Sequence, residues 1–277
     1  MSQKFIKLTA VFLTILILGG CTTTDKLKLN QIQEKLPLKI LLVQTPIAIK
    51  TEKLQTVLEP EEKKSLSKPD QIISAQITHA QNSAELEIKK DLKDRPDLFI
   101  IKSVPERSGL VKNIQGTATL SQEEANSLRK QTGADAVLKF KITDYGLTPK
   151  SWRTGYIAFE VTSTAAVAGF LVYSGTIAAK TVAGGYLAQE AVEETAEGYA
   201  GFWALNEVCR PVRIEAELIQ LKPVEILWKG HYTGLDDVKL GRLVKTINKN
   251  ERYLQLDKST TYAAKGLISD LSKSLNK

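Results

Sequence analysis

The sequence is poor in the side chains that build metal sites and disulfide scaffolds. Its 277 residues include two cysteines, two histidines and one methionine. A disulfide scaffold needs several cysteine pairs, and a zinc site needs three or four His, Cys or carboxylate ligands at short spacing. Neither His79 nor His231 has such ligands at suitable positions. We therefore expect no metal centre and no cofactor.

Motifs for covalent or phosphate chemistry are also missing. No GxSxG sequence occurs, and the run "SGTIAAKT" only imitates a phosphate-binding loop, because Ser174 and Ala179 stand where the motif requires glycine. We expect no enzyme and no small-molecule substrate. The alternative, an enzyme acting on cell-wall polymer, would have to use groups such as His231 and Asp236.

The charge is mildly basic, with 38 Lys and Arg residues against 31 Asp and Glu residues. Lysines are scattered among acidic residues, as in "TEKLQTVLEPEEKKSLSK", and no basic stripe with interleaved aromatic residues is visible. Nucleic-acid-binding surfaces concentrate positive charge on one face. The pattern indicates an ordinary solvated surface and no nucleic-acid partner.

The amino terminus has the layout of a secretory signal peptide. Lys4 and Lys7 precede an apolar run at residues 8–18, which is shorter than the roughly 20 residues that a membrane-spanning helix needs. The following residues, Leu18-Gly19-Gly20-Cys21, resemble the lipobox of bacterial lipoproteins. The resemblance implies that residues 1–20 are a signal peptide and that Cys21 is the lipid-attachment site at the start of the mature chain.

Lipid attachment at Cys21 would make the membrane the first partner of the chain. Two or more acyl chains anchor a protein stably, whereas one gives marginal binding. By the sorting rule of such lipoproteins, Thr22 in place of an aspartate implies the outer membrane, with the protein facing the periplasm. Residues 21–36 are then a polar tether. Cys209 has no remaining partner in the chain, so we expect it to be a buried apolar residue or to form an intermolecular bridge.

The rest of the chain, residues 37–277, shows the periodicities of one α/β domain with a mixed sheet. Residues 51–70 read as a charged loop, and the capping box Ser121–Glu124 with Gly133 brackets the second helix. Leu138, Phe140 and Ile142 alternate with polar residues, which predicts one buried and one exposed sheet face. The expected strands are 36–49, 97–104, 135–145, 210–221 and 224–234, the expected helices are 71–94 and 121–132, and a C-terminal helix contains Ala263, Leu267, Leu271 and Leu275.

An Ala/Gly-rich insert at residues 156–208 interrupts this pattern. From Val161 to Gln189 it is uncharged except for Lys180. Three interpretations compete: a membrane-spanning helix, a pair of barrel strands, or a helical hairpin. Small residues four apart, such as Ala165 with Gly169 and Gly175 with Ala179, permit close helix packing. We therefore expect a helical hairpin.

Two segments, "TGADAVLKFKITDYG" and "RIEAELIQLKPVEILWKGHYTG", resemble envelope lipoproteins related to the curli-secretion channel subunit and to the lipoprotein activators of penicillin-binding proteins. The resemblance implies a periplasmic α/β domain that binds other envelope proteins or associates with itself. We therefore expect a non-enzymatic, lipid-anchored accessory or oligomeric component of an outer-membrane assembly. The alternative is a pore-forming or secretion-channel subunit whose insert enters the outer membrane.

Overall fold

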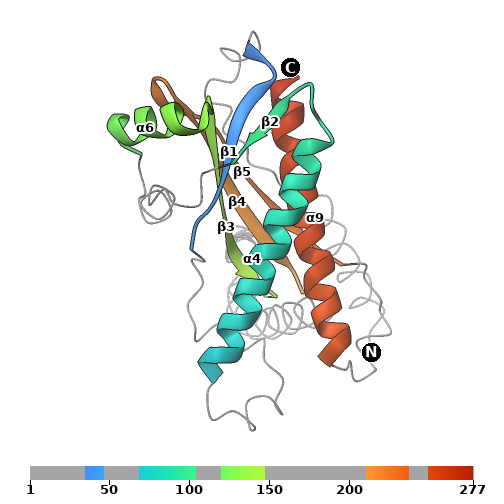
Figure 1. Ribbon diagram of the computed structural model, residues 1–277. Coiled ribbons are helices and arrows are strands. Elements are labelled where there is room, and N and C mark those ends of the chain that lie inside the picture. Colours follow the sequence, from blue (N-terminus) through green and yellow to red (C-terminus); the bar gives the residue numbers. More distant parts are fainter. Residues whose placement is uncertain (1–34, 47–68, 104–119, 147–209, 237–248, 277) are drawn as a thin grey trace, which may run out of the picture.

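The computed structural model describes residues 35–46, 69–103, 120–146, 210–236 and 249–276. Within them lies one five-stranded mixed sheet with three helices, which confirms the expected α/β class (Figure 1). The strands are β1 (Leu38–Gln44), β2 (Phe99–Lys102), β3 (Ala136–Tyr145), β4 (Val212–Leu221) and β5 (Val224–Gly234). The helices are α4 (Pro69–Lys93), α6 (Gln122–Thr132) and α9 (Lys249–Leu275).

The sheet order is β2-β1-β3-β4-β5, with β1 parallel to both β2 and β3 and with β4 and β5 antiparallel to their neighbours. Parallel strands need crossover connections, and α4 and α6 supply them between β1, β2 and β3. β4 and β5 form the hairpin that the alternating pattern predicts, with Lys222 and Pro223 in the turn.

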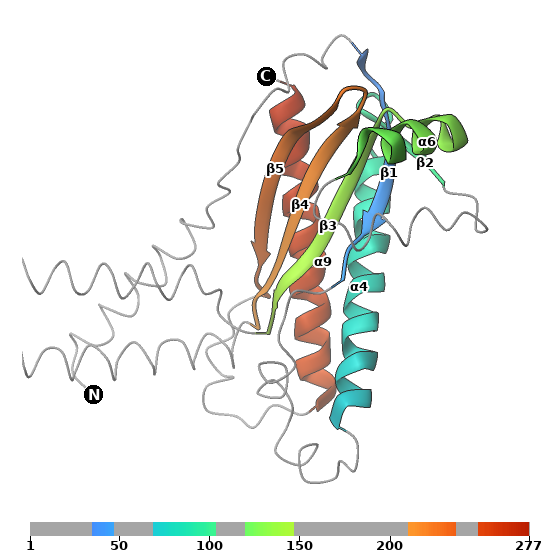
Figure 2. The ribbon, with the colours of Figure 1, turned by 90° about the vertical axis from the view of Figure 1, so that its left-hand side faces the viewer.

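α4 and α9 lie side by side on one face of the sheet and form a helical layer (Figures 1 and 2). In α4, apolar residues recur every fourth position from Ala80 through Ala84 and Ile88 to Leu92, and all are at most 1% exposed. In α9 the four residues expected to form an apolar face, from Ala263 to Leu275, are equally buried. Together with the inward side chains of the sheet they form the main hydrophobic core.

α6 packs against the opposite face of the sheet, close to the β4–β5 turn, over a second and smaller core that includes Leu41, Leu128 and Val137. Gln122, at the start of α6, bonds to the β4–β5 hairpin. The Gln122 side chain donates to the Leu221 carbonyl at 3.4 Å and accepts from the Val224 N–H at 3.3 Å. α6 therefore covers only one end of this sheet face.

The predicted capping box of α6 is confirmed. The Ser121 hydroxyl accepts from the Glu124 N–H at 3.2 Å, and the Glu124 carboxylate accepts from the Ser121 N–H at 2.9 Å. Gly133 ends the helix in the left-handed region at φ 65. The hydrogen bonds from Ser121 lower the pKa of Glu124 below its usual value of 4.5.

We predict that Ser121→Ala lowers the free energy of unfolding by about 1 kcal/mol, because it leaves an N–H at the helix start without its side-chain acceptor. The contribution of Glu124 is present above pH 4.5 and is lost as the pH falls through the lowered pKa of the folded protein. Urea unfolding at neutral and at acidic pH measures both effects. Ser121→Thr, which keeps a hydroxyl, should retain most of the stability; equal losses for Ala and Thr would contradict the capping explanation.

Several element boundaries differ from the sequence-based ones. α4 begins at Pro69 and not at residue 71, because proline suits the first turn of a helix, where its missing N–H costs no hydrogen bond. The edge strand β2 has four residues, half the length expected from its apolar run. The predicted signal peptide, most of the tether, and the insert at 156–208, with Cys21 and Cys209, lie outside the described residues.

Candidate functional site

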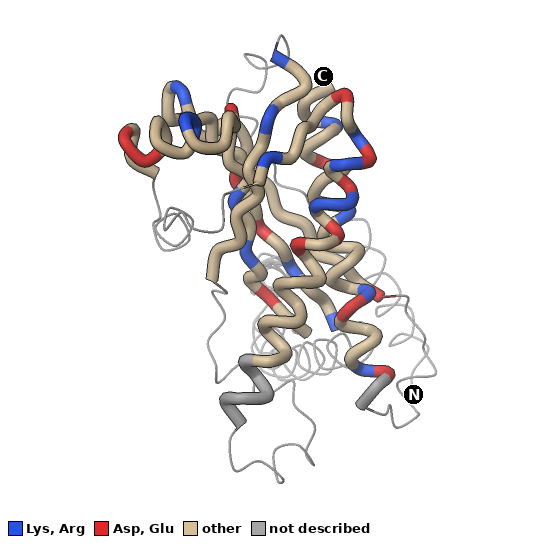
Figure 3. The backbone as a smooth tube through the Cα atoms, viewed as in Figure 1, with Lys and Arg blue, Asp and Glu red and all other residues tan. Residues whose placement is uncertain are grey.

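The sheet face away from α4 and α9 carries rows of charged side chains on β3, β4 and β5. On these strands the neighbouring apolar residues, such as Phe140 and Ala216, belong to the main core, so the polar residues between them point to the other face. We call this surface the ladder face; charged residues of both signs lie along its strands in Figure 3. It consists of Lys139, Lys141, Asp144, Arg213, Glu215, Glu217, Lys229, His231 and Thr233.

Strand register aligns these residues in rows that cross the sheet. One row places Glu217 between Lys139 and Lys229, and the Lys229 Nζ lies 2.8 Å from the Glu217 Oε1. The next row places Glu215 between Lys141 and His231. Opposite charges on directly paired residues stabilise a sheet by about 0.2–1 kcal/mol per pair, so each row supports the register as well as the surface.

Glu215 ties the second row to a third, in which Arg213 lies between Asp144 and Thr233. The Glu215 carboxylate oxygens lie 3.4 Å from the Lys141 Nζ and 3.5 Å from the Arg213 Nε. The register of β3 shifts between Ile142 and Asp144, and this irregularity brings Asp144 opposite Arg213 on the ladder face. The expected alternation, which places Thr143 on the exposed face, therefore holds only as far as Lys141.

Lys139 lies on the ladder face but is buried, since it is only 6% exposed. It sits at the margin of the part that α6 covers, beside Val43 in the parallel register. Burial lowers the pKa of the Lys139 ammonium, and the carboxylates of Glu217 and Glu124 act in the opposite direction. Lys139 thus depends on nearby acidic groups to remain charged inside the fold.

We predict that Glu217→Gln lowers the free energy of unfolding by about 1–2 kcal/mol at neutral pH, because a nearly buried ammonium loses its cross-strand carboxylate. A lowered lysine pKa means that the unfolded chain binds the extra proton, so stability rises with pH and the deficit shrinks toward pH 10. Urea unfolding across this range measures it. Lys229→Gln removes the exposed partner of the same carboxylate and should cost under about 0.5 kcal/mol; equal costs would contradict the special role of Lys139.

The structure separates the residues proposed for an enzymatic alternative. His231 lies on the ladder face opposite Glu215. Asp236 is 2% exposed and contacts α9, where its carboxylate lies 3.7 Å from the Lys258 Nζ and its backbone N–H donates to the Ser259 hydroxyl at 3.1 Å. The pair is therefore not arranged as an acid and a base facing one substrate.

The other histidine, His79, links two helices. The His79 Nε2 lies 3.0 Å from the Asp257 Oδ1, which links α4 to α9 near a second link between the side chains of Gln76 and Tyr253. In the described part of the chain, no three His, Cys, Asp or Glu side chains are placed to hold a metal ion. None of the described helices is long and apolar enough to cross a membrane.

Sequence reasoning recognised the alternating strands but not the ladder face as one surface. The signal was present, since β3 and β4 carry Lys, Arg or Glu at alternate positions over part of their length, and β5 carries Lys229, His231 and Thr233 at alternate positions. What was missing is the register that aligns these positions across the sheet. A pattern within one strand defines its faces, whereas the rows depend on pairings between strands far apart in the sequence.

No family model and no curated protein matches this chain. Among solved structures it is similar to a PelC dodecamer of a point variant from Paraburkholderia phytofirmans, with 11% identity, a TM-score of 0.33, and coverage of 92% of this chain and 96% of that one. A second PelC dodecamer from the same organism gives 10% identity, a TM-score of 0.33, and coverage of 92% and 97%. At this level the likeness carries no argument about function or assembly.

Proposed function

We propose that this chain is a lipid-anchored envelope protein that acts without catalysis, through protein–protein contacts, as an accessory or oligomeric component of an outer-membrane assembly. The anchor is Cys21, and the domain faces the periplasm. The observation that carries the contact role is the ladder face, a broad surface on which charged side chains of both signs are held in fixed rows. Such a surface selects a partner by electrostatic complementarity.

The geometry of the ladder face supports this role in two ways. First, its ion pairs are only half-buried, since Lys141 and Lys229 are each 42% exposed and Glu215 and Glu217 are each 35% exposed. Polar atoms of a partner can therefore reach them without unfolding the sheet. Second, the backbone beneath is a regular antiparallel sheet, so the charges are held in place before a partner arrives, which reduces the entropy cost of binding.

The edge of the sheet offers a second contact element beside the ladder face. β5 is the last strand in the sheet order, so within the described residues no strand pairs with its outer edge. Edge strands present backbone N–H and C=O groups that can pair with an added strand from another chain. A partner that pairs with β5 would lie directly beside Lys229 and His231.

The experiment that tests this proposal is site-specific photocrosslinking in a Gram-negative host. A photoreactive amino acid replaces Lys141 or Lys229, and a matched control replaces Glu123, an exposed residue of α6. We expect discrete crosslinked species in the outer-membrane fraction from the two ladder-face positions and none from the control. Mass spectrometry of the crosslinked species then distinguishes a second copy of this chain from another envelope protein.

Two outcomes would overturn the proposal. Crosslinks that form equally at Glu123 and at the ladder face would show that contact is not specific to this surface. An absence of crosslinks from both ladder-face positions, in protein that is correctly located and folded, would show that the surface contacts no protein.

A further inference from the structure

The outer side of the helical layer carries most of the exposed large apolar side chains among the described residues. Among the described residues, four large hydrophobic side chains are exposed, and three of them lie on these helices: Leu86 of α4 at 67%, and Leu254 and Tyr262 of α9 at 56% and 42%. The fourth, Ile100, is on the edge strand β2. Exposed apolar residues that gather on one surface mark a contact site more often than scattered ones do.

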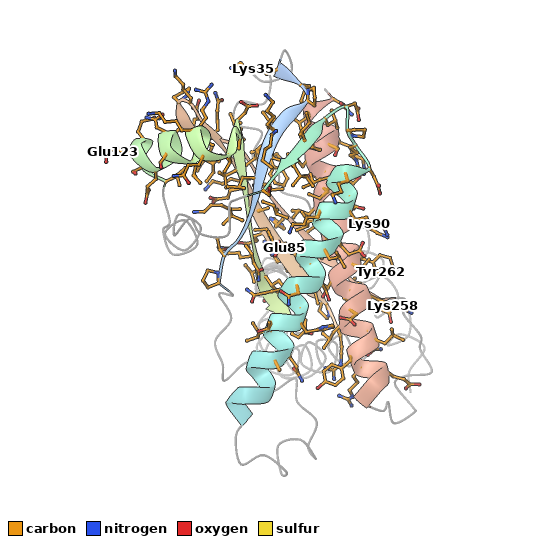
Figure 4. All side chains as sticks on the ribbon, viewed as in Figure 1. Lys35, Glu85, Lys90, Glu123, Lys258 and Tyr262 are labelled. Atoms are coloured by element: carbon orange, nitrogen blue, oxygen red, sulfur yellow. The ribbon has the colours of Figure 1, made fainter. Side chains whose placement is uncertain are left out.

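Helix geometry places these three residues on the same outer side. Leu86 is seven residues after His79, so both lie on one stripe of α4, and His79 reaches across to Asp257 of α9. Leu254 and Tyr262 are eight residues apart on α9, with Lys258 midway between them. Figure 4 shows Lys90, Tyr262 and Lys258 following one another along the same side of the layer. Because α4 and α9 lie side by side, the apolar residues of both helices contribute to one surface.

The Lys, Arg, Asp and Glu residues that are fully exposed on these two helices are mostly lysines. Among the described side chains of α4 and α9, the exposed charged residues are four lysines and a single acid. The other acids of these helices are paired or partly buried: Glu85 pairs with Lys89, Asp257 pairs with His79, Glu87 and Asp270 are half-buried, and Asp91 is 8% exposed. The five exposed residues are Lys90, Lys93, Lys265, Lys273 and Glu251.

Lysines around exposed leucine and tyrosine are the composition of a helix that lies on a membrane surface. The lysine stems extend along apolar surface while the ammonium groups reach phosphates, and tyrosine favours the boundary between headgroups and acyl chains. An anionic phospholipid surface offers negative charge over the whole area of the helical layer. We call this surface, made of Leu86, Leu254, Tyr262 and the four exposed lysines, the basic helical face.

We propose that the basic helical face docks on an anionic phospholipid surface. The inference rests on the proposed function, because attachment at Cys21 would hold the domain beside a bilayer and raise the effective concentration of lipid at this face. The segment between Cys21 and the described domain is long enough for the helical layer to reach the bilayer, because its extended length exceeds the length of α9. Fourteen residue steps separate Cys21 from Lys35, where the described chain begins, and they reach about 50 Å when extended. α9, with 27 residues, is only about 40 Å long.

The test uses the full-length acylated protein with vesicles of defined composition. Tyr262→Cys in a Cys209→Ala background is labelled with an environment-sensitive fluorophore, and a matched control carries the label at Lys229→Cys on the ladder face. With vesicles of equal parts phosphatidylcholine and phosphatidylglycerol, we expect the label at position 262 to become about twofold brighter than with phosphatidylcholine alone. The label at position 229 should not change. Raised salt should reverse the effect at 262, since it screens lysine–phosphate attraction.

A charge-reversal variant provides the second part of the test. Lys90→Glu combined with Lys273→Glu should abolish the brightening at position 262 while the protein still floats with both kinds of vesicle and unfolds at an unchanged urea concentration. Flotation with both vesicles but equal emission at 262 would overturn the docking inference and leave the anchor intact. Flotation only with phosphatidylglycerol vesicles, lost on charge reversal, would support docking and overturn the anchor. Brightening that needs an added envelope protein, irrespective of lipid, would assign the face to a protein partner and overturn docking on lipid.

Discussion

Gly234→Ala is expected to lower the free energy of unfolding by about 3 kcal/mol, at the upper end of the usual range for overpacking a core. A Cβ at this position would lie 2.0 Å from the Ser259 carbonyl oxygen and 2.4 Å from the Ala263 nitrogen. Both atoms belong to the backbone of α9, so no side chain can rotate away. The new methyl group would push α9 off the end of β5, where Ala263 and Leu267 belong to the main core. Urea unfolding at constant m-value measures the loss.

Two other glycines provide graded controls for this prediction. At Gly266 a Cβ would lie 2.3 Å from the ring of Tyr232, a partly buried side chain that can turn aside, so Gly266→Ala should cost less. At Gly133 no atom lies within 4 Å, and Gly133→Ala should cost about 1 kcal/mol through the left-handed backbone alone. The expected order of destabilisation is Gly234 first, Gly266 second and Gly133 last. A larger loss at Gly133 than at Gly234 would contradict the steric explanation.

The secondary structure of this domain could be predicted where a local pattern decides it. The capping box at Ser121 and Glu124 satisfies backbone groups within one turn, so it depends on no distant part of the chain. The alternating segments of β4 and β5 each define a buried face, and a short turn brings them into a hairpin. The buried side of α4 is likewise set by a local pattern, since its buried apolar residues recur at four-residue steps from Ala80 to Leu92.

Features that depend on two distant segments were not predictable. Whether β4 pairs with β3 or with another strand is decided by burial across the whole sheet, and the ladder face exists only because β3 and β4 pair in one register. Lys139 reads as an exposed residue from its alternation, yet the covering helix and neighbouring strand bury it. The need for glycine at position 234 arises from α9, whose contact with the end of β5 no local sequence pattern indicates.

The two surfaces derived from the structure are suited to different roles because they lie on opposite sides of the sheet. The ladder face pairs acids with bases and is nearly balanced in charge, which suits selective contact with a protein. The basic helical face has four fully exposed lysines, against one fully exposed acid, around exposed apolar residues, which suits a lipid surface. A domain lying with its helices on the bilayer would direct the ladder face away from the membrane. The outward face of the sheet would then remain accessible to periplasmic partners.

If Cys21 is the lipid-attachment site that we propose, Cys21→Ser removes the protein from the outer membrane almost completely. A thiol is needed to form the thioether to diacylglycerol, and each methylene of an acyl chain contributes about 0.8 kcal/mol of membrane binding, so losing all chains abolishes stable anchoring. The proposed signal peptide at residues 1–20 should remain uncleaved, because the proposed lipobox ends at Cys21 and the variant lacks that cysteine. Sucrose-gradient separation of the two membranes and intact-mass analysis measure both consequences.

The uncleaved precursor makes this prediction more specific than a simple loss of membrane binding. The apolar run at residues 8–18 would still associate with the inner membrane, so we expect the variant to move there and not to become fully soluble. Cys209→Ser is the matched control and should stay in the outer membrane with an acylated mass, since Cys209 is not part of the lipobox. An unchanged distribution and mass for Cys21→Ser would overturn the anchor. The ladder face would then need a partner that meets this domain without lipid attachment at Cys21.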